Sequence, residues 1–334
     1  MVVKMQKVII TDYIEVPDIE QDILGPDVDI ICLHEEDENK FPAIIEEADA
    51  ILVWHAHISA VTIDRLKRCK GMVRYGVGYD GIDHVYAQKK GLIFANTPDY
   101  GVDEVADTAS AMILSLVRRM PEYDLACRSY TSGWQEHTLA PLKRTNEHKL
   151  GINGMGRIGS AVGLRMKAFG MEVAFFDPYV VSGYEKALGV KRFDSLEELQ
   201  DYASIISIHT PLTAETSGMV DTDFINALND GSIFINTARG GIIDSLNSIS
   251  AGMQNGKLAG VGLDVLPQEP PSESESLLKI WKDKEHPMSS RIIISPHTAY
   301  YSDRAWEEMR EKAAQNTKRA LDGMQMKNII SIPE

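Results

Sequence analysis

The chain has 334 residues, of which 44% are hydrophobic and 25% are charged, and its formal net charge at pH 7 is −15. This length exceeds what one hydrophobic core usually serves, so we expect two domains. The acidic balance argues against direct nucleic-acid binding, which needs clustered Lys and Arg, but it permits a small anionic substrate in a locally basic pocket.

Cysteine usage and hydropathy give further limits. Cys32, Cys69 and Cys127 are widely spaced and form no metal-ligand pattern, which predicts a reducing compartment and no metal site. The N-terminal segment lacks an apolar stretch long enough for a signal peptide, and no run approaches the ~20 apolar residues of a membrane span. We therefore expect a cytoplasmic protein that makes no membrane contact.

The first hundred residues alternate short apolar runs with helix-compatible stretches. "FPAIIEEA" and "SAVTIDRLKRC" have helical spacing, with Ser59 or Thr62 as a candidate N-cap. The apolar runs are rich in Val and Ile and are bounded by Gly, Pro and Asp, which favours buried parallel strands. These predicted strands are Lys7–Thr11, Val28–Leu33, Ala50–His55, Met72–Val77 and Leu92–Asn96.

A long helical pattern follows from Val102 to about Tyr130. Its apolar residues recur at three- and four-residue steps, and Pro121 should kink or divide it. The apolar stripe is broader than one domain needs. This favours a homodimer that pairs through the helix.

A second alternating series begins at Leu150, with six strand candidates: "LGING", "EVAFFD", "ASIISIHT", "SIFINTA", "GVGLDV" and "RIIISPH". Six strands are what a full Rossmann sheet needs. A last helical run starts at Ser302 and ends at Gly323. The pattern predicts an α/β protein with two Rossmann-like or flavodoxin-like domains and parallel sheets. A nucleotide domain at residues 101–300 would be inserted into a substrate domain made from 1–100 and 301–334, with the chemistry in the cleft between them.

The glycine spacing Gly154-x-Gly156-x-x-Gly159 lies at the end of the first strand of this series, and a helical run follows at once. In a dinucleotide-binding turn the first glycine permits the tight turn, the second admits the pyrophosphate and the third lets the helix pack on the strand. The free N–H groups of the helix would face the phosphates, so we expect residues of the turn to contact the cofactor: Met155, Gly156, Arg157 and Ile158. An unrelated glycine-rich turn is the alternative.

Asp177 follows Gly159 by eighteen residues, close to the ~20 expected for the carboxylate that binds the adenosine ribose. A carboxylate accepts hydrogen bonds from the 2′-hydroxyl and repels a 2′-phosphate. The next residues, Pro178 and Tyr179, bring no Arg to neutralise such a phosphate. The sequence therefore predicts NAD in preference to NADP.

Three further segments lie at the ends of predicted strands: "NTARGG", "GVGLDVLPQEP" and "SPHTAYYS". The carboxyl ends of strands in a doubly wound sheet face the ligand crevice, so Arg239, Glu269 and His297 could converge there. Taken singly, each residue has an ordinary structural explanation. Arg239 could be a surface cation, Glu269 a solvated loop acid, and His297 a capping or core histidine.

Together with the glycine turn, these segments resemble the D-specific 2-hydroxyacid dehydrogenases from about Arg74 to Leu321. The resemblance implies that Arg239, Glu269 and His297 are catalytic. "RYGVGYDGID" resembles the family's carboxylate-binding loop, which implies substrate contacts for Arg74, Val77 and Gly78, and Tyr300 is a further candidate. Cofactor contacts are implied for Thr108, Thr210, Pro211, Thr216, Thr237, Ala238, Arg239, Asp264 and His297.

Within the family, "FFDPYVVSGYEKALGV" and "PHTAYYSDRAWEEMREKAA" are most similar to the C-terminal-binding protein branch of NAD(H)-binding corepressors. That branch has Trp where this chain has Tyr300, and the segment between Glu269 and His297 is longer here; we expect it to be surface decoration or to shape substrate choice.

The residue types suit reduction of a 2-oxoacid. Arg239 can bind the carboxylate and polarise the ketone, His297 can donate the proton, and Glu269 can hold the imidazolium in place. The alternative is an NADH-binding corepressor with little turnover, although no low-complexity tail supports it. A formate- or phosphite-type dehydrogenase fits Glu269 and the Arg74 loop less well.

Overall fold

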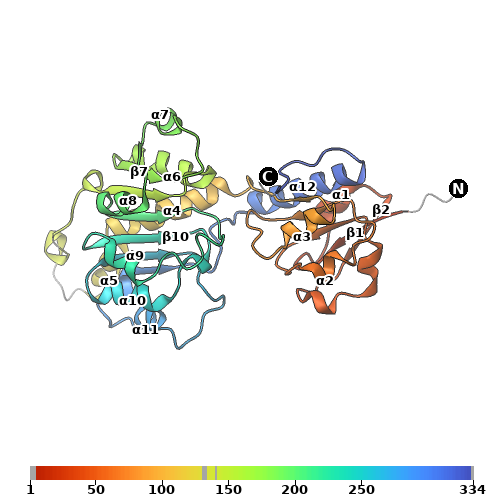
Figure 1. Ribbon diagram of the computed structural model, residues 1–334. Helices are drawn as coiled ribbons and strands as arrows, with labels where there is room; N and C mark the ends of the chain where they lie inside the picture. The colour runs from red at the N-terminus through yellow and green to blue at the C-terminus, as the bar shows by residue number, and fades with distance from the viewer. Residues whose placement is uncertain (1–4, 130–133, 140, 332–334) are drawn as a thin grey trace. The chain divides into compact units, whose positions relative to one another are not determined.

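The computed structural model describes residues 5–129, 134–139 and 141–331 and divides into two compact units (Figure 1). Unit 1 comprises Met1–Gly101 and Ser302–Glu334, and unit 2 comprises Val102–Tyr301. Each unit has its own parallel sheet, so the predicted α/β fold is confirmed. No helix in the described part of the chain is long and apolar enough to cross a membrane.

Unit 1 is built on a five-stranded sheet in the order β2-β1-β3-β4-β5. Its strands are β1 (Gln6–Ile10), β2 (Val28–Cys32), β3 (Ala50–Val53), β4 (Met72–Arg74) and β5 (Phe94–Ala95). All pairings are parallel, and β3 is buried along its whole length. Strands of a parallel sheet are apolar in continuous runs because helices cover both faces, which is the Val- and Ile-rich pattern of these segments.

Short helices connect these strands. They are α1 (Asp18–Leu24), α2 (Ala60–Ile63) and α3 (His84–Lys89), with 3-10 turns at Glu38–Lys40 and Ala43–Glu47. Ser59 is the N-cap of α2 and accepts the N–H of Val61, as predicted for one of its two candidates. The α-helical spacing of "FPAIIEEA" is realised only as the second 3-10 turn, because the segment is too short to extend further.

Helix α12 (Asp303–Leu321) brings the end of the chain back to unit 1, where it packs on α1. Its Arg310 lies 2.9 Å (Nε) and 2.6 Å (Nη2) from the carboxylate oxygens of Glu20, whose side chain is fully buried. Burial alone would lower the pKa of Arg310, but the hydrogen bonds and charge of Glu20 and Asp18 outweigh it and raise that pKa. This buried ion pair fixes α12 to the N-terminal segment.

Unit 2 is built on a seven-stranded parallel sheet in the order β12-β11-β10-β9-β6-β7-β8. Its strands are β6 (Lys149–Asn153), β7 (Glu172–Phe176), β8 (Lys191–Arg192), β9 (Ile205–Ile208), β10 (Ser232–Asn236), β11 (Leu258–Leu263) and β12 (Ile292–Ile294). The six predicted strands are all present. The seventh, β8, has only two residues and no apolar periodicity, so the sequence did not indicate it.

The long helical pattern is divided, as Pro121 predicted. Helix α4 (Val102–Val117) ends before Arg119, which has a left-handed φ of 52°, and α5 (Met120–Ser129) follows. The apolar residues of α4 are buried within unit 2, against α6 (Arg157–Ala168), β10 and β11. They therefore give no surplus apolar surface, and the homodimer remains a prediction without this support.

The remaining helices of unit 2 are α7 (Tyr184–Leu188), α8 (Leu196–Tyr202), α9 (Thr222–Ala227), α10 (Leu246–Gln254) and α11 (Ser276–Lys282). Helix α11 lies in the long segment between Glu269 and His297. Its Leu277, Leu278 and Ile280 are buried, and it packs on α10. This segment is therefore part of the core of unit 2 as well as a surface loop.

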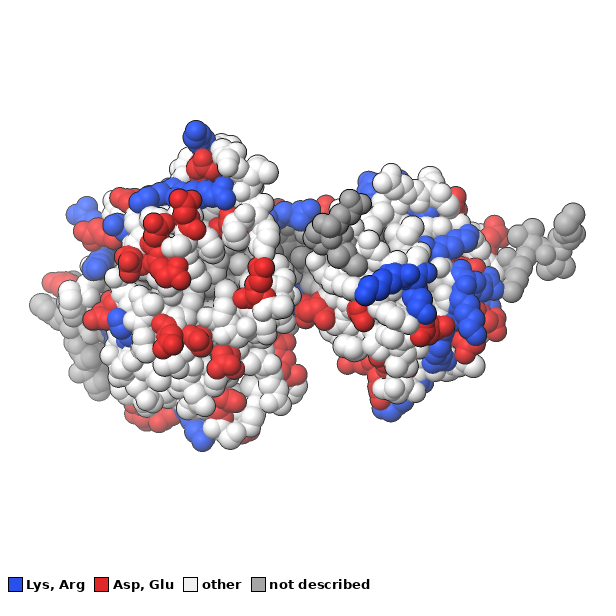
Figure 2. Space-filling view, viewed as in Figure 1, with Lys and Arg blue, Asp and Glu red and all other residues white. Residues whose placement is uncertain are grey.

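In the face drawn in Figure 2, acidic side chains are scattered over unit 2, whereas Lys and Arg side chains gather on unit 1.

Candidate active site

The three candidate catalytic residues all lie in unit 2, at the carboxyl ends of three neighbouring strands. Arg239 follows β10, Glu269 follows β11 and His297 follows β12. Because parallel strands end at the same edge of a sheet, the three loops are brought together there.

His297 and Glu269 form a direct pair. The imidazole Nδ1 lies 2.7 Å from Oε2 of Glu269, and Oε1 of the same carboxylate accepts the N–H of Leu266 at 2.8 Å. Burial alone would raise the pKa of Glu269, but the hydrogen bonds from His297 and Leu266 and the charges of His297 and Arg239 lower it. Glu269 is thus held as a carboxylate, and the Nε2 atom of His297 stays available to a substrate. The backbone of His297 has a left-handed φ of 55°, a conformation that non-glycine residues adopt rarely and often at functional sites.

The loop that carries Arg239 is braced by Asn236 and Gly240, two residues to which the sequence had given no role. The side-chain amide of Asn236 donates to the carbonyl of Arg239 at 2.9 Å and accepts the N–H of Ala238 at 2.9 Å. The next residue, Gly240, packs so closely that an added Cβ would lie 1.8 Å from the carbonyl oxygen of Leu266. The Arg239 loop and the Glu269 loop are therefore in backbone contact, and only glycine permits it.

Asp264 anchors the loop that carries His297. Its side chain is 2% exposed, and its carboxylate accepts the N–H groups of Thr298 and Ala299 and the hydroxyl of Ser295. Its carbonyl accepts the N–H of His297 at 2.8 Å. These contacts give Asp264 a positioning role beside the predicted cofactor contact.

The glycine turn has the geometry that its spacing predicted. Gly154 has a φ of +93°, and an added Cβ would lie 2.7 Å from the backbone of His209. An added Cβ on Gly159 would lie 2.1 Å from the carbonyl oxygen of Gly154. Gly156, by contrast, has nothing within 4 Å and is the N-cap of α6, without a side chain to cap the helix. An open helix N-terminus of this kind suits a pyrophosphate.

Asp177 lies at the end of β7, beside this turn. Its carboxylate accepts the N–H of Met155 at 2.8 Å and that of Tyr179 at 2.9 Å. The N–H of Met155 is therefore already hydrogen-bonded to Asp177, and the side chain of Met155 is only 1% exposed. Arg157 and Ile158 open α6. Asp177 has one neighbour that the sequence did not predict. Arg192, from the two-residue strand β8, donates to the carbonyl of Asp177 at 3.0 Å.

Two buried hydroxyl groups at this edge have no partner. The Oγ1 atoms of Thr210, after β9, and Thr237, after β10, lack a hydrogen-bond partner, as does Nδ1 of His209, whose pKa burial lowers to about 4. Buried polar groups are rarely left unsatisfied, so such atoms indicate a polar ligand. Ribose and amide groups of a dinucleotide have the required chemistry, and the residues present fit NAD.

The other predicted cofactor contacts lie close by in the fold. Thr216 closes its own loop by donating to the carbonyl of Pro211 at 2.6 Å. Thr108, on α4, donates to the carbonyl of Ala299 in the His297 loop at 3.4 Å. Both hydroxyls thus shape loops at the candidate site.

The predicted carboxylate-binding loop belongs to unit 1. Arg74 ends β4, and its guanidinium lies over Gly76, where an added Cβ would be 3.0 Å from Nη1. Among the described residues, the N–H groups of Val77 and Gly78 have no acceptor. Free neighbouring N–H groups beside a cation can bind an anion.

An aromatic cluster that the sequence did not predict lies at the same edge of unit 1. Tyr13, after β1, stacks on Trp54, after β3, with ring centroids 4.8 Å apart, and Trp306 lies 4.7 Å from Trp54. Tyr13 and Trp54 each come a few residues after a strand, which was the signal in the sequence, whereas Trp306 lies on α12. Nearby, Asp12, Glu36 and His55 are the one group among the described residues that could hold a metal ion, but the Asp12 carboxylate already accepts three backbone N–H groups.

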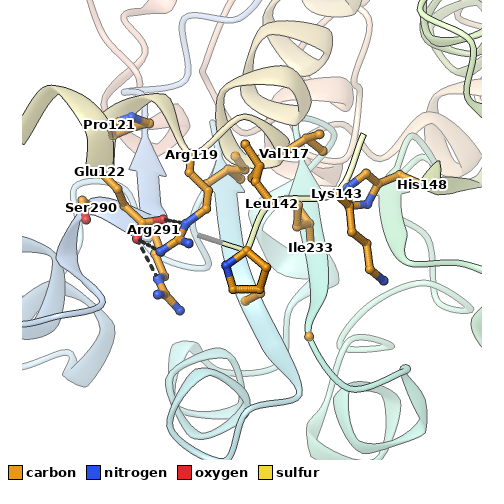
Figure 3. Close-up of a pocket in the computed structure, with 14 residues that line it drawn as sticks. Val117, Arg119, Pro121, Glu122, Leu142, Lys143, His148, Ile233, Ser290 and Arg291 are labelled. Carbon is orange, nitrogen blue, oxygen red and sulfur yellow. Dashed lines mark hydrogen bonds and ion pairs between the residues drawn. The ribbon is translucent and has the colours of Figure 1, made fainter. Parts of the chain in front are cut away.

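A pocket of about 210 Å³ lies at the opposite edge of the unit 2 sheet, near the amino ends of β10 and β11 (Figure 3). Its Glu122 is bound by Arg119 at 2.7 Å and by Arg291 at 3.3 Å. Burial and the charge of Lys143 lower the pKa of His148 there. None of the predicted catalytic residues lines this pocket, so we do not assign the chemistry to it.

Comparison with known proteins agrees with this geometry. Residues 110–299 match the family model described as D-isomer specific 2-hydroxyacid dehydrogenase, NAD binding domain. C-terminal-binding protein 1 of Caenorhabditis elegans is 30% identical over 84% of this chain, and D-3-phosphoglycerate dehydrogenase of Bacillus subtilis is 33% identical over 85%. The chain spans only 38% and 52% of these two relatives.

Among solved structures, D-lactate dehydrogenase from Aquifex aeolicus, complexed with NAD and lactic acid, is 31% identical and superposes with a TM-score of 0.82. That similarity covers 98% of this chain and 100% of the other. The chain therefore belongs to the D-isomer-specific 2-hydroxyacid dehydrogenase family, as its motifs predicted. Its unit 2 contains the NAD-binding domain of that family, which supports NAD as the cofactor.

Proposed function

We propose that this protein is an NAD-dependent oxidoreductase that interconverts a D-2-hydroxyacid and a 2-oxoacid. The observation that carries the proposal is the His297–Glu269 pair, 2.7 Å apart, at the sheet edge where the Arg239 loop also ends. An acid–base histidine, an orienting carboxylate and an arginine are the groups that carbonyl reduction requires.

Each side chain has a distinct task in this proposal. The bound cofactor supplies or accepts the hydride. Arg239 binds the substrate carboxylate and polarises the ketone oxygen, since its planar guanidinium can donate to both. His297 donates a proton to that oxygen through Nε2 and takes it back in the reverse direction, while Glu269 holds Nδ1 and stabilises the imidazolium.

Unit 1 contributes the anion-binding loop in this proposal. Arg74 and the N–H groups of Val77 and Gly78 bind the acid group of the substrate, and Tyr300 of unit 2 contacts the substrate as well.

We further propose that the protein acts as a homodimer. The corepressor-like alternative is not favoured, because the matching family model is that of a dehydrogenase domain.

The test is a screen of 2-oxoacids with NADH, followed by loss of the NADH absorbance, with the D and L hydroxyacids assayed in reverse. We expect turnover of at least one 2-oxoacid, use of the D isomer alone, and loss of activity in His297→Asn. A protein that binds NADH but reduces no 2-oxoacid would refute the proposal.

A further inference from the structure

One short segment of unit 1 holds the proposed anion-binding loop in position. Asn96 and Thr97 follow β5 directly, and they are 5% and 2% exposed. Neither side chain takes part in the chemistry proposed above, so the hydrogen bonds that they form need another explanation.

Thr97 binds three successive carbonyl groups of the loop. Its hydroxyl lies 2.6 Å from the carbonyl oxygen of Arg74 and also within hydrogen-bond distance of that of Tyr75, so one proton is shared between the two. Its backbone N–H donates to the carbonyl of Gly76 at 3.3 Å. A single residue thus fixes the direction of three consecutive peptide groups.

Asn96 binds the fourth carbonyl and is itself held by a later segment of the chain. Its side-chain amide donates to the carbonyl of Val77 at 2.6 Å. Its own N–H donates to the carbonyl of Asn328 at 3.3 Å, and the N–H of Ile330 donates to that of Phe94 at 2.9 Å. Asn96 is therefore a fixed point against which the loop is positioned.

The opposite side of these peptide groups is open. Because a trans peptide is planar, its N–H points away from its carbonyl. The N–H groups of Gly76, Val77 and Gly78 consequently point away from Asn96 and Thr97, and in the described part of unit 1 none of the three has an acceptor. Val77 is 37% exposed, so an anion can reach this row of donors.

We propose that Asn96 and Thr97 are positioning residues for substrate binding. By holding the carbonyls of residues 74–77, they present three consecutive N–H groups to the carboxylate of a 2-oxoacid. The inference rests on the proposed function of this loop and adds Gly76 to its donors. A loop that is already ordered binds an anion more tightly, because it loses little conformational entropy on binding.

A purely structural role for the two side chains makes a different prediction. Buried polar groups that only satisfy carbonyls would contribute to the stability of unit 1 and would leave the affinity for a carboxylate unchanged. Positioning residues change that affinity even where the variant remains folded.

The experiment measures anion binding without turnover, with oxamate as the probe. Oxamate has a carboxylate next to a carbonyl, as a 2-oxoacid has, but its carbonyl belongs to an amide and does not accept a hydride. It is titrated into the NADH-bound protein and followed by calorimetry and by the NMR shifts of backbone N–H groups. In the unaltered chain, oxamate should shift the N–H resonances of Gly76, Val77 and Gly78.

The variants remove or keep single donors. Thr97→Val removes the shared hydroxyl at nearly constant volume, Thr97→Ser keeps it, and Asn96→Ala removes the side-chain amide. Thr317→Val is the matched control, because Thr317 is a fully buried threonine of unit 1 whose hydroxyl donates to the carbonyl of Ala313 in its own helix, α12.

We expect Thr97→Val and Asn96→Ala each to weaken oxamate binding about tenfold, the scale of one hydrogen bond. Thr97→Ser and Thr317→Val should bind oxamate as the unaltered chain does. The comparison of Thr97→Val with Thr97→Ser decides the question if Asn96→Ala does not fold.

Unchanged affinity in Thr97→Val or in Asn96→Ala would overturn the role of that residue. An equal loss in Thr317→Val, or the absence of shifts at the three N–H groups, would overturn the proposal as a whole. Oxamate binding requires no turnover, so this result is independent of the 2-oxoacid screen and the two proposals fail separately.

Discussion

Each candidate catalytic side chain is oriented by a neighbouring polar group. Glu269 accepts from the Leu266 N–H and from Nδ1 of His297, and Asn236 ties the loop of Arg239 at both its carbonyl and the preceding N–H. Such contacts matter because the hydrogen bond at one imidazole nitrogen decides what the other nitrogen can do.

Glu269→Gln should alter the pH dependence of 2-oxoacid reduction. The hydrogen bonds from His297 and Leu266 outweigh burial and lower the pKa of Glu269, so the carboxylate is charged at neutral pH and is neutralised only in acid. In Gln this charge is gone, and the imidazolium is no longer stabilised. The loss of reductive rate at high pH should therefore begin at lower pH in the variant, measured as kcat/KM against pH. A profile that does not move would show that Glu269 is not the partner of His297 in catalysis.

Arg239 and Arg74 should differ in their kinetic effects. Arg239→Gln should lower kcat and raise KM, because the ketone oxygen gains negative charge in the transition state. Arg74→Ala should raise KM about tenfold or more with a smaller loss of kcat, the mark of uniform binding. Steady-state kinetics of both variants on the same 2-oxoacid make the comparison. A change in KM alone for Arg239→Gln would reverse the two assignments.

At the scale of elements, the site depends on close contact between loops from β10, β11 and β12. Gly240 touches the backbone at Leu266, and Asp264 holds the segment from Ser295 to Ala299. These contacts link the three candidate catalytic loops to one another through groups other than the side chains proposed to carry out the chemistry.

Gly240→Ala should separate the Arg239 and Glu269 loops. The new methyl group would meet a carbonyl oxygen at 1.8 Å, and overpacking of this kind costs about 1–3 kcal/mol. We expect at least a tenfold loss of kcat/KM in a protein that still folds, checked by circular dichroism and kinetics. Gly163→Ala in α6 is the control, since its Cβ would meet only side-chain atoms, none nearer than 3.2 Å. Equal activity in the two variants would refute the loop contact.

The anchoring of α12 to unit 1 should depend on its buried ion pair. Glu20→Ala leaves Arg310 buried without its main partner, which typically costs about 3–5 kcal/mol. Urea unfolding should show this loss. Asp18→Asn alters the exposed partner of the same arginine, 67% accessible, and should have a much smaller effect. Similar losses in the free energy of unfolding of both variants would mean that the burial of Glu20 does not determine how much the ion pair contributes to stability.

On the scale of the whole molecule, the two units have separate sheets and cores, and all of the predicted cofactor residues belong to unit 2. The turns after β6, β7, β9 and β10 contain the open glycine, the carboxylate proposed to bind the ribose and the unsatisfied hydroxyls. Ligand binding should therefore stabilise unit 2 first.

Hydrogen exchange with and without NADH tests this expectation. At a free concentration 100 times Kd, a ligand adds about 2.7 kcal/mol to the stability of the state that binds it. Exchange should slow in the segments that follow β6, β7, β9 and β10 of unit 2. Protection confined to unit 1 would contradict the assignment of the cofactor to unit 2.

The sequence by itself determined the fold class, the glycine turn and the candidates Arg239, Glu269 and His297. Strand runs and helical periodicity are local signals, and glycine spacing reflects a local backbone requirement. Such features survive in any tertiary arrangement, and they were sufficient to identify the family.

The remaining features of the fold and the site were decided only by the tertiary structure, because they depend on pairs of residues that lie far apart in the chain. Strand β8 is two residues long, so nothing local indicated that Arg192 would reach Asp177. The apolar stripe of α4 appeared to be surplus until α6, β10 and β11 were seen to cover it. The contact of Gly240 with Leu266 likewise arises from the packing of two loops, and backbone packing across a sheet edge leaves no periodicity in the sequence.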